Sequence, residues 1–288
     1  MVIDLHVHST ASDGTDTPAQ VVARASRIGV RVIALTDHDT VAGWPEAAEA
    51  VDRLDEEVAV VPGAEISCLL GSTSLHILGY LFDPTHPELA AELERLRTDR
   101  TRRARAMVDR LAELGAPVTW EQVSRLAGDG AVGRPHIARA LVAAGVVDDV
   151  PAAFTAEWIG DGGRAYVEKY SLDPARAIAL VHDAGGVAVF AHPAASTRGP
   201  VVTEDQIAEL VSAGLDGLEV DHPDHDEGTR RRLRALADEL GVLATGASDY
   251  HGAVKAVEIG TCTTDPAVLE ELVARAHGSA VMGAVMGR

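Results

Sequence analysis

The sequence predicts an α/β barrel that one long helical insertion interrupts, and two observations lead to this fold class. Short apolar runs alternate with segments of helical periodicity along most of the 288 residues. Repeated strand–helix units form a parallel sheet, and seven or more such units favour a closed or nearly closed barrel. The alternation stops between residues 87 and 170, where the sequence is mostly of helical type. We therefore expect a distorted, TIM-like (β/α)7 barrel with a helical insertion over its C-terminal mouth.

The first half of the barrel is predicted from apolar runs that are separated by amphipathic segments. VIDLHV, VRVIALT, VAVVPGAEI and SLHILGYL are short and apolar, as buried strands are. PAQVVARASRIG and WPEAAEAVDRL have apolar residues at helical spacing and good helix starts. The predicted strands span residues 2–7, 30–36, 58–66 and 74–81, and the predicted helices span residues 18–29 and 44–54.

The insertion is predicted to be a separate helical unit. Amphipathic helices are expected over residues 87–115, 120–128 and 134–145. We predict that residues 1–86 and 171–288 form the barrel and that residues 87–170 cover its mouth. The first of these helices carries the one basic run of an acidic chain, which predicts either a solvated helix face or a surface that guides an RNA end. Its members are Arg95, Arg97, Arg100, Arg102, Arg103, Arg105 and Arg110.

The second half of the barrel returns to the alternating pattern near residue 173. Its helical segments are amphipathic, and its apolar segments are short enough to be strands. The predicted helices span residues 174–185, 204–214 and 228–241, and the predicted strands span residues 185–191, 216–221, 242–248 and 257–261.

The composition predicts an ordinary globular protein of the cytoplasm. Hydrophobic residues make up 47% of the chain and charged residues 24%. Only two cysteines are present, both in apolar segments, so no disulfide framework is expected. No basic leader precedes an apolar run at the N-terminus, and no run approaches the ~20 apolar residues of a membrane span. The net charge of −19 argues against binding extended nucleic acid, because such binding neutralises phosphates with Lys and Arg.

Nine residues of metal-binding type are spread over almost the whole chain, and nearly all of them follow an apolar run. The carboxyl ends of barrel strands meet at one mouth, so we expect these side chains to converge there. Each one alone has a structural explanation, such as a helix cap or a buried polar group. Together they favour a polynuclear metal site. The nine are His6, His8, Asp13, His38, Glu65, His76, His192, Asp249 and His251.

Two of these positions carry a more specific prediction. Side chains alternate between the faces of a strand, so Asp4, His6 and His8 share a face and both imidazoles can reach one ion. Glu65 would be costly to bury without a partner, and bridging two cations is one arrangement that offsets this cost. We also expect Asp4 and Asp37 to fix the tautomers of ligand histidines.

The order of the motifs resembles that of the polymerase and histidinol phosphatase (PHP) superfamily of metal-dependent phosphoesterases. HxH, DG, TDHD, GxE, a central histidine, AHP and SDxHG follow one another along nearly the whole chain. The resemblance implies up to three divalent ions, and mixed His/carboxylate sites tolerate manganese, iron or zinc, with magnesium a further option. The implied sites are His6, His8, Glu65 and Asp249 for the first ion, Glu65, His76 and His192 for the second, and Asp13, His38 and His251 for the third.

Segments of the insertion sharpen the resemblance. VGRPHIARAL at residues 132–141 and GGRAYVEKY at residues 162–170 are similar to nucleoside 3′,5′-bisphosphate phosphatases and 5′→3′ exoribonucleases of this superfamily. Asp13, where many members have histidine, is typical of the same branch. The resemblance implies that a metal-activated water hydrolyses a phosphate ester, with Glu65 as the bridging catalytic residue. The expected substrate is a nucleoside 3′,5′-bisphosphate or a short 5′-phosphorylated RNA.

Substrate contacts are predicted from basic residues outside the nine. Arg134 and His136 could form a phosphate clamp that reaches down from the insertion, since arginine binds phosphate bidentately. Both residues also fit the exposed start of a helix. His222 could orient the phosphate or protonate the leaving oxygen, since imidazole titrates near neutrality. Lys169 and Arg198 are weaker candidates of the same kind.

Two other functions stay open, and some properties are not predicted. The alternatives are a histidinol-phosphate or other sugar-phosphate phosphatase, and a non-catalytic PHP module. The sequence predicts a small phosphorylated partner and no membrane partner. It predicts no oligomeric state and does not identify the native metal.

Overall fold

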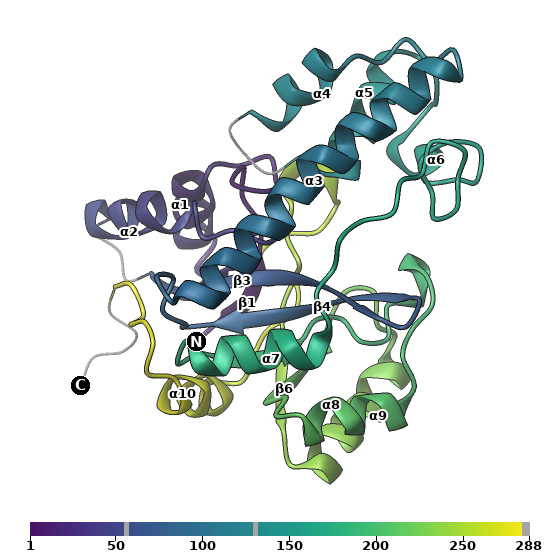
Figure 1. Cartoon of the computed structure of the whole chain (residues 1–288). Coiled ribbons are helices and arrows are strands. Elements are labelled where there is room, and N and C mark those ends of the chain that lie inside the picture. The colour runs from purple at the N-terminus through teal and green to yellow at the C-terminus, as the bar shows by residue number, and fades with distance from the viewer. Residues whose placement is uncertain (55–57, 129–131, 284–288) are drawn as a thin grey trace.

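Seven strands form one continuous sheet in the computed structural model, which describes residues 1–54, 58–128 and 132–283 (Figure 1). The strands are neighbours in the order of the sequence, from β1 to β7. Their bounds are Ile3–Val7 (β1), Val32–Leu35 (β2), Ala59–Leu70 (β3), Thr73–Tyr80 (β4), Val187–Phe190 (β5), Gly217–Asp221 (β6) and Leu243–Gly246 (β7).

One strand runs against the others, which departs from the parallel sheet that the alternation predicts. β4 is antiparallel to both β3 and β5, whereas the other neighbours pair in parallel. The reason is the short connection after β3, where Gly71 adopts a φ of 60° and the chain turns straight back. A turn of this kind joins antiparallel strands, whereas parallel strands need a crossover helix.

The sheet closes almost completely, with one seam between its first and last strands. Val7 of β1 forms an isolated parallel bridge with Tyr250, and the His8 amide donates to the Tyr250 carbonyl over 2.9 Å. The prediction of a distorted seven-stranded barrel is thus confirmed. The eighth strand expected at residues 257–261 is wrong. There the chain turns at Gly260, whose amide donates to Asp4 over 2.7 Å.

Within the described residues, six helices pack around the barrel, and capping residues fix where most of them begin. Thr17 and Thr203 form capping boxes, and Asp173, Asp226 and Asp265 accept hydrogen bonds from the first-turn amides. These helices are Pro18–Arg27 (α1), Trp44–Arg53 (α2), Pro174–Asp183 (α7), Glu204–Ser212 (α8), Glu227–Leu240 (α9) and Pro266–Arg275 (α10).

The insertion rises from the barrel on one long helix (Figure 1). Leu89 and Leu96, near the start of that helix, belong to the hydrophobic cluster of the barrel. Met107 and Leu111, near its end, belong to a second cluster formed within the insertion. The helix therefore has one end in each core. The helices of the insertion are Pro87–Glu113 (α3), Trp120–Ala127 (α4), Arg134–Ala143 (α5) and Val150–Ala153 (α6).

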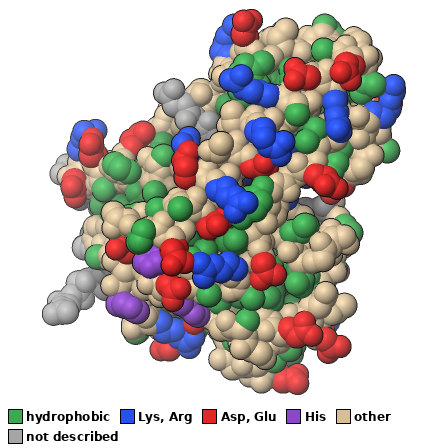
Figure 2. All heavy atoms as spheres, in the orientation of Figure 1, with side chains coloured by type: hydrophobic (Ala, Val, Ile, Leu, Met, Phe, Trp, Pro, Cys, Tyr) green, Lys and Arg blue, Asp and Glu red, His purple; other side chains and the backbone are tan. Residues whose placement is uncertain are grey.

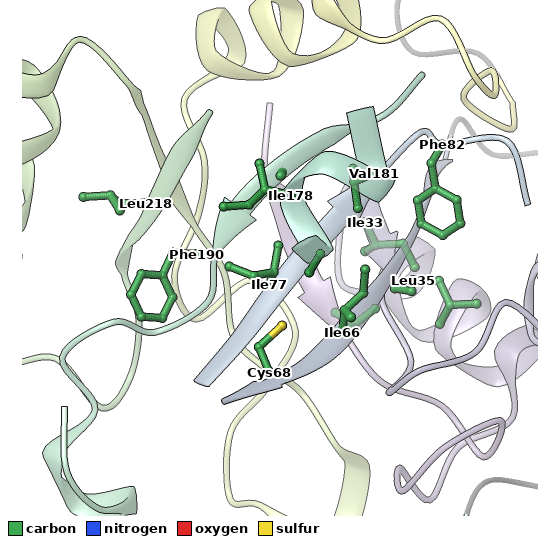
Figure 3. Packing of buried hydrophobic residues seen from close by; sticks show 14 of the residues in the cluster. Ile33, Leu35, Ile66, Cys68, Ile77, Phe82, Ile178, Val181, Phe190 and Leu218 are labelled. Atoms are coloured by element: carbon green, nitrogen blue, oxygen red, sulfur yellow. The ribbon is translucent and has the colours of Figure 1, made fainter. Parts of the chain in front are cut away.

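Apolar side chains hold the sheet against its helices. Figure 3 shows Ile77 of β4 and Phe190 of β5 beside Ile178 and Val181 of α7, all within one buried cluster. A separate cluster is made mainly of strand side chains, among them Val61 of β3. These layers fix the strands from which the polar residues of the mouth project.

The surface and the cysteines agree with the composition. Basic and acidic side chains lie interspersed over the face shown in Figure 2. Cys68 and Cys262 are both free and buried, which confirms that no disulfide joins them. Among the helices of residues 1–54, 58–128 and 132–283, none combines the length and the apolar character that a membrane crossing requires.

Candidate metal centre

The nine residues predicted as metal ligands lie together at the barrel mouth. Eight of them fall into three overlapping groups in which the nitrogen and oxygen atoms lie within 4.8 Å of one another. The ninth, His192, places Nε2 3.1 Å from Oε1 of Glu65. Residues that are up to about 240 positions apart in the sequence therefore share one site. The groups are His6, His8, Glu65 and Asp249; His8, Asp13, His38 and His251; and His38, Glu65 and His76.

Glu65 occupies the centre, and its two oxygens face different imidazoles. Oε2 lies 3.3 Å from Nε2 of His6, 3.1 Å from Nε2 of His8 and 3.1 Å from Nδ1 of His38. Oε1 lies 2.6 Å from Nδ1 of His76 and 3.1 Å from His192. A carboxylate with this arrangement can contribute one oxygen to each of two neighbouring cation positions.

The two outer groups differ slightly from the sets that the family resemblance implies. His251 and His38 lie 3.3 Å and 3.7 Å from the carboxylate of Asp13, as expected, but His8 Nδ1 also approaches Asp13 at 3.6 Å. His38 joins the group of Glu65 and His76 as well. His8 and His38 therefore lie between groups, so the division into separate sites is less sharp than predicted.

The backbone delivers these side chains in two ways. Glu65 and His76 lie within the β3–β4 hairpin and not at strand ends, because β3 continues to Leu70 beyond the barrel. His192 and Asp249 follow β5 and β7 and adopt positive φ angles of 34° and 51°. Such conformations are strained for residues other than glycine, and they cluster at functional sites. At these two positions, the placement of the side chain in the site outweighs the cost of the strained backbone.

A buried carboxylate behind the site was not predicted. Oε1 of Glu219 lies 3.0 Å from Nδ1 of His6, and its Oε2 accepts from the His192 amide over 2.7 Å. Burial opposes ionisation of Glu219, but the neighbouring His6 imidazole lowers the pKa of the carboxyl to about 2. The signal was a charged residue in the middle of the apolar stretch GLEV at residues 217–220.

The expected role of Asp4 as the partner of an imidazole is wrong, because Glu219 contacts the ring of His6 instead. Asp4 accepts hydrogen bonds from the amides of His6, Ser248 and Gly260. Asp37 acts on His8 through a hydroxyl: Ser12 Oγ donates to Asp37 over 2.6 Å and lies 3.3 Å from Nδ1 of His8.

The donor set suits divalent cations. Nδ1 of His38 and of His76 are buried without a hydrogen bond, although each lies close to an oxygen of Glu65. Burial lowers the pKa of His38 well below its ordinary value and also lowers that of His251, so both rings present neutral lone pairs. Neutral imidazole nitrogens that face carboxylate oxygens are the ligand combination that Mn²⁺, Fe²⁺ and Zn²⁺ accept.

A cavity of about 640 Å³ opens above these residues. Its wall contains metal-centre residues, including Glu65 and Asp249, together with basic side chains from the insertion and from the barrel. A volume of this size is typical of small-molecule sites. The basic residues of the wall are Arg100, Arg103, Arg134, Lys169 and Lys255.

Two predicted substrate contacts belong to this wall. Arg134 pairs with Asp161 at 2.7 Å, and Lys169 donates from Nζ to Ser74 Oγ over 2.8 Å. Burial, with help from the Arg100 guanidinium, lowers the pKa of the Lys169 ammonium to about 8. A cation that is partly desolvated in this way interacts strongly with an incoming anion.

The remaining predicted contacts are placed differently. His136 is 2% exposed, and its Nδ1 accepts from the Gly133 amide at the start of α5, so its predicted phosphate contact has no support here. His222 is equally buried and lies 3.5 Å from Asp249, behind the centre. The side chain of Arg198 lies outside the part that the structure describes.

Arg100 was named only as a member of the basic run, and its contacts at the site were not predicted. Its Nε donates to Asp39 over 2.5 Å and its Nη2 to Ser67 over 2.6 Å, which ties α3 to the loop beside His38. The signal was its register: Leu96, Arg100, Arg103 and Met107 lie three or four residues apart, on the inward stripe of α3.

The other arginines of the run are exposed, as the solvated-face interpretation predicts, except Arg103, which is 8% exposed and donates from Nε to the Val167 carbonyl. Arg95, Arg97 and Arg102 are 61%, 47% and 61% exposed, and each pairs with an acidic residue three positions earlier. Such exposed pairs contribute little to stability.

Lys255 is a further residue that the prediction missed. Its Nζ lies 2.6 Å from Oδ2 of Asp249, and it also faces the cavity. The signal was composition, because Lys169 and Lys255 are the only two lysines of the chain and both line this cavity.

A barrel mouth that gathers imidazoles and carboxylates beneath a basic cavity defines a metal-dependent phosphoesterase. Comparison with known proteins agrees. The PHP domain description matches residues 4–93. A putative metal-dependent phosphoesterase from Bifidobacterium adolescentis superposes with a TM-score of 0.90 at 35% identity, covering 96% of each chain.

Relatives of known name extend the match over most of the chain. A 5′-3′ exoribonuclease of Haemophilus influenzae is 37% identical, covering 89% of this chain and 92% of the relative. A 3′,5′-nucleoside bisphosphate phosphatase of Chromobacterium violaceum is 35% identical, with coverage of 86% and 87%. A phosphoribosyl 1,2-cyclic phosphate 1,2-diphosphodiesterase of Eggerthella lenta is 35% identical, with coverage of 88% and 95%. The chain belongs to the PHP family of phosphoester hydrolases.

Proposed function

We propose that this chain hydrolyses nucleoside 3′,5′-bisphosphates and removes nucleotides from the end of short 5′-phosphorylated RNA. The observation that carries the proposal is that one cavity contains both the metal centre and basic side chains of the insertion. The metal centre lies in its barrel wall, and Arg134 and Lys169 lie in the wall that the insertion contributes. A substrate with two phosphates can place one at each. The names of the Haemophilus and Chromobacterium relatives favour the same substrates.

The metal ions of the proposal are three divalent cations, with manganese, iron or zinc preferred. His6, His8, Glu65 and Asp249 would hold the first, Glu65, His76 and His192 the second, and Asp13, His38 and His251 the third. When bound, such ions supply Lewis acidity toward phosphoryl oxygens and make water a nucleophile at neutral pH.

The protein's own residues position this chemistry. Glu65 would bridge two cation positions, since its oxygens face separate sets of imidazoles. Glu219 holds the ring of His6 through Nδ1, which directs Nε2 toward the centre. Arg134 and Lys169 would bind the phosphate that is not cleaved. His222, buried against Asp249, would orient that carboxylate.

The insertion has a proposed role of its own. Residues 87–170 would act as the cap that selects the substrate, because they supply Arg100, Arg103, Arg134 and Lys169 to the cavity wall, and the described side chains of the barrel add Lys255. The partner would be a nucleotide or an RNA end and not a long nucleic acid, given the net charge of −19. The cytoplasmic location stays a prediction from the sequence.

The test is an assay of purified protein with Mn²⁺ on adenosine 3′,5′-bisphosphate and on 5′-phosphorylated oligoribonucleotides. We expect release of phosphate from the first and of nucleotides from the second, and loss of both in Glu65→Gln. Glu209→Gln, an exposed carboxylate of α8, is the matched control. Absence of activity on either substrate would refute the assignment, and less than one metal ion per chain would favour a non-catalytic module.

A second candidate is a phosphatase or phosphodiesterase of base-free sugar phosphates. The name of the Eggerthella relative favours it, and histidinol phosphate belongs to the same chemical class. Competition between adenosine 3′,5′-bisphosphate and such substrates separates the two functions by their relative kcat/KM values.

A further inference from the structure

An exposed aromatic side chain lies in the wall of the active-site cavity. Phe154 is 39% exposed, whereas the other two phenylalanines of the chain, Phe82 and Phe190, are 0% and 3% exposed. Phe154 and Phe190 are the aromatic residues of this wall within the described part of the chain. Because Phe190 packs into the barrel cluster, Phe154 is the residue that offers an open ring.

The local structure holds Phe154 at this position. It directly follows α6, whose first turn is capped by Asp149 through the Ala152 amide over 2.8 Å. The Phe154 amide donates to the Pro151 carbonyl over 3.0 Å. The ring is therefore presented by an ordered turn, and its exposure is not the consequence of a loose end.

Apolar residues continue on both sides of the mouth. Val150 and Pro151 lie beside Phe154 in the wall, and Val201 lies on the segment that leads into α8. In Figure 1, α6 lies in the upper part of the molecule and α8 in its lower part. Val201 is 43% exposed, so two large apolar side chains of one cavity face solvent. Apolar and aromatic side chains in the wall of a cavity suit contact with an apolar part of a ligand.

Phe154 also connects to the predicted phosphate contact. The guanidinium carbon of Arg134 lies 5.5 Å from the centre of the Phe154 ring and 6.0 Å from that of Tyr166. A ligand that fills this cavity therefore contacts basic side chains, the metal centre and an apolar ring at the same time. A nucleotide has both the phosphates and the flat π face that this combination requires.

We propose that Phe154 stacks on the nucleobase of the substrate, with Val201 as a second apolar contact in the same cavity. The inference rests on the proposed function, since it names the part of the substrate that the cap recognises. Stacking of this kind accepts any base, because every base has a π face. Phe154 would thus favour nucleotides over base-free sugar phosphates without selecting among nucleotides.

The experiment compares two ligands that differ only in the base. Binding of adenosine 5′-monophosphate and of ribose 5-phosphate to the Mn²⁺-loaded protein is measured by titration calorimetry. We expect the unaltered protein to favour the nucleotide. Phe154→Ala should weaken the nucleotide about 10- to 100-fold, or about 1.4 to 2.8 kcal/mol at 1.4 kcal/mol per tenfold change, and leave ribose 5-phosphate unchanged.

Two further variants test whether the change in nucleotide affinity depends on the aromatic ring of Phe154. Phe154→Trp retains a π face and should preserve nucleotide affinity, and Val273→Ala, at a similarly exposed apolar position on α10, should change neither ligand. Equal weakening of both ligands by Phe154→Ala would mean that Phe154 only positions Arg134, and would overturn the proposal. So would an unaltered protein without preference for the nucleotide. A Phe154-dependent preference in a protein that hydrolyses neither proposed substrate would overturn the proposed function alone.

Discussion

At the scale of single residues, the centre depends on groups that never touch the substrate. Glu219 holds the ring of His6 and the amide of His192, and so places two of the nine predicted ligands. Partners of this kind commonly change metal affinity or activity by 10- to 100-fold when they are lost.

Glu219→Gln should therefore lower Mn²⁺ affinity and kcat/KM by about 10- to 100-fold, because the amide keeps the shape of the side chain and loses its charge. Metal titration followed by an assay at saturating Mn²⁺ checks this. Part of the activity should return at high Mn²⁺. Unchanged affinity in Glu219→Gln, with Glu209→Gln as control, would contradict the role of Glu219.

Lys169 gives the site a pH dependence on the alkaline side. The pKa of its ammonium is lowered to about 8 by burial, so the cation is present below pH 8 and is lost as the pH rises through that value. If Lys169 binds phosphate, KM for a phosphorylated substrate should rise above about pH 8. In Lys169→Gln, KM should be higher at pH 7 and should lack this rise. A KM profile that is identical in both proteins would exclude this role.

At the scale of elements, one contact fastens the insertion to the metal centre. Arg100 of α3 binds Asp39 and Ser67, and Ser67 in turn donates its amide and hydroxyl to Asp39 over 2.7 and 2.9 Å. Asp39 adopts a φ of 55° and follows His38 directly. The backbone conformation beside His38 is therefore coupled to the middle of the long helix.

Arg100→Met should destabilise the protein by about 3 kcal/mol, because it leaves the Asp39 carboxylate buried without its cation. Arg102→Met, which removes an exposed arginine of the same helix, should cost less than about 1 kcal/mol. Urea unfolding measures both free energies. The double variant Arg100→Met/Asp39→Asn should recover part of the loss. Equal effects of the two single variants would contradict the coupling.

At the scale of the whole molecule, the metal centre connects distant parts of the chain. The nine predicted ligands come from β1 and the segment after it, the segment after β2, the β3–β4 hairpin and the segments after β5 and β7. Ions that bind only the folded arrangement stabilise it by mass action. Chelation with EDTA should therefore lower the midpoint of thermal unfolding, and Mn²⁺ should restore it. In Glu65→Gln, EDTA should shift the midpoint of thermal unfolding less than it does in the unaltered protein. If EDTA did not change the midpoint of the unaltered protein, the prediction of bound metal would be contradicted.

The sequence predicted much of this arrangement, and the failures have physical causes. His6, His8 and Asp249 could be found because ionisable residues next to apolar runs stand out. The antiparallel β4 was not foreseen, since periodicity does not encode strand direction. Arg100 was noted only as a member of the basic run, because its partner Asp39 lies 61 positions away in the sequence. Lys255 was missed although its partner Asp249 lies only six positions away.

The long helix α3 has one end in each hydrophobic core, and this arrangement limits how the insertion can be exchanged between related proteins. None of the nine predicted ligands lies within residues 87–170, so the cap could be exchanged between relatives without disturbing the chemistry. The graft would have to enter the helix between Leu96, which packs on the barrel, and Ala104, which packs within the cap. Arg100 stands at that junction. A transplanted cap would function only if it brought, or retained, an arginine in this register.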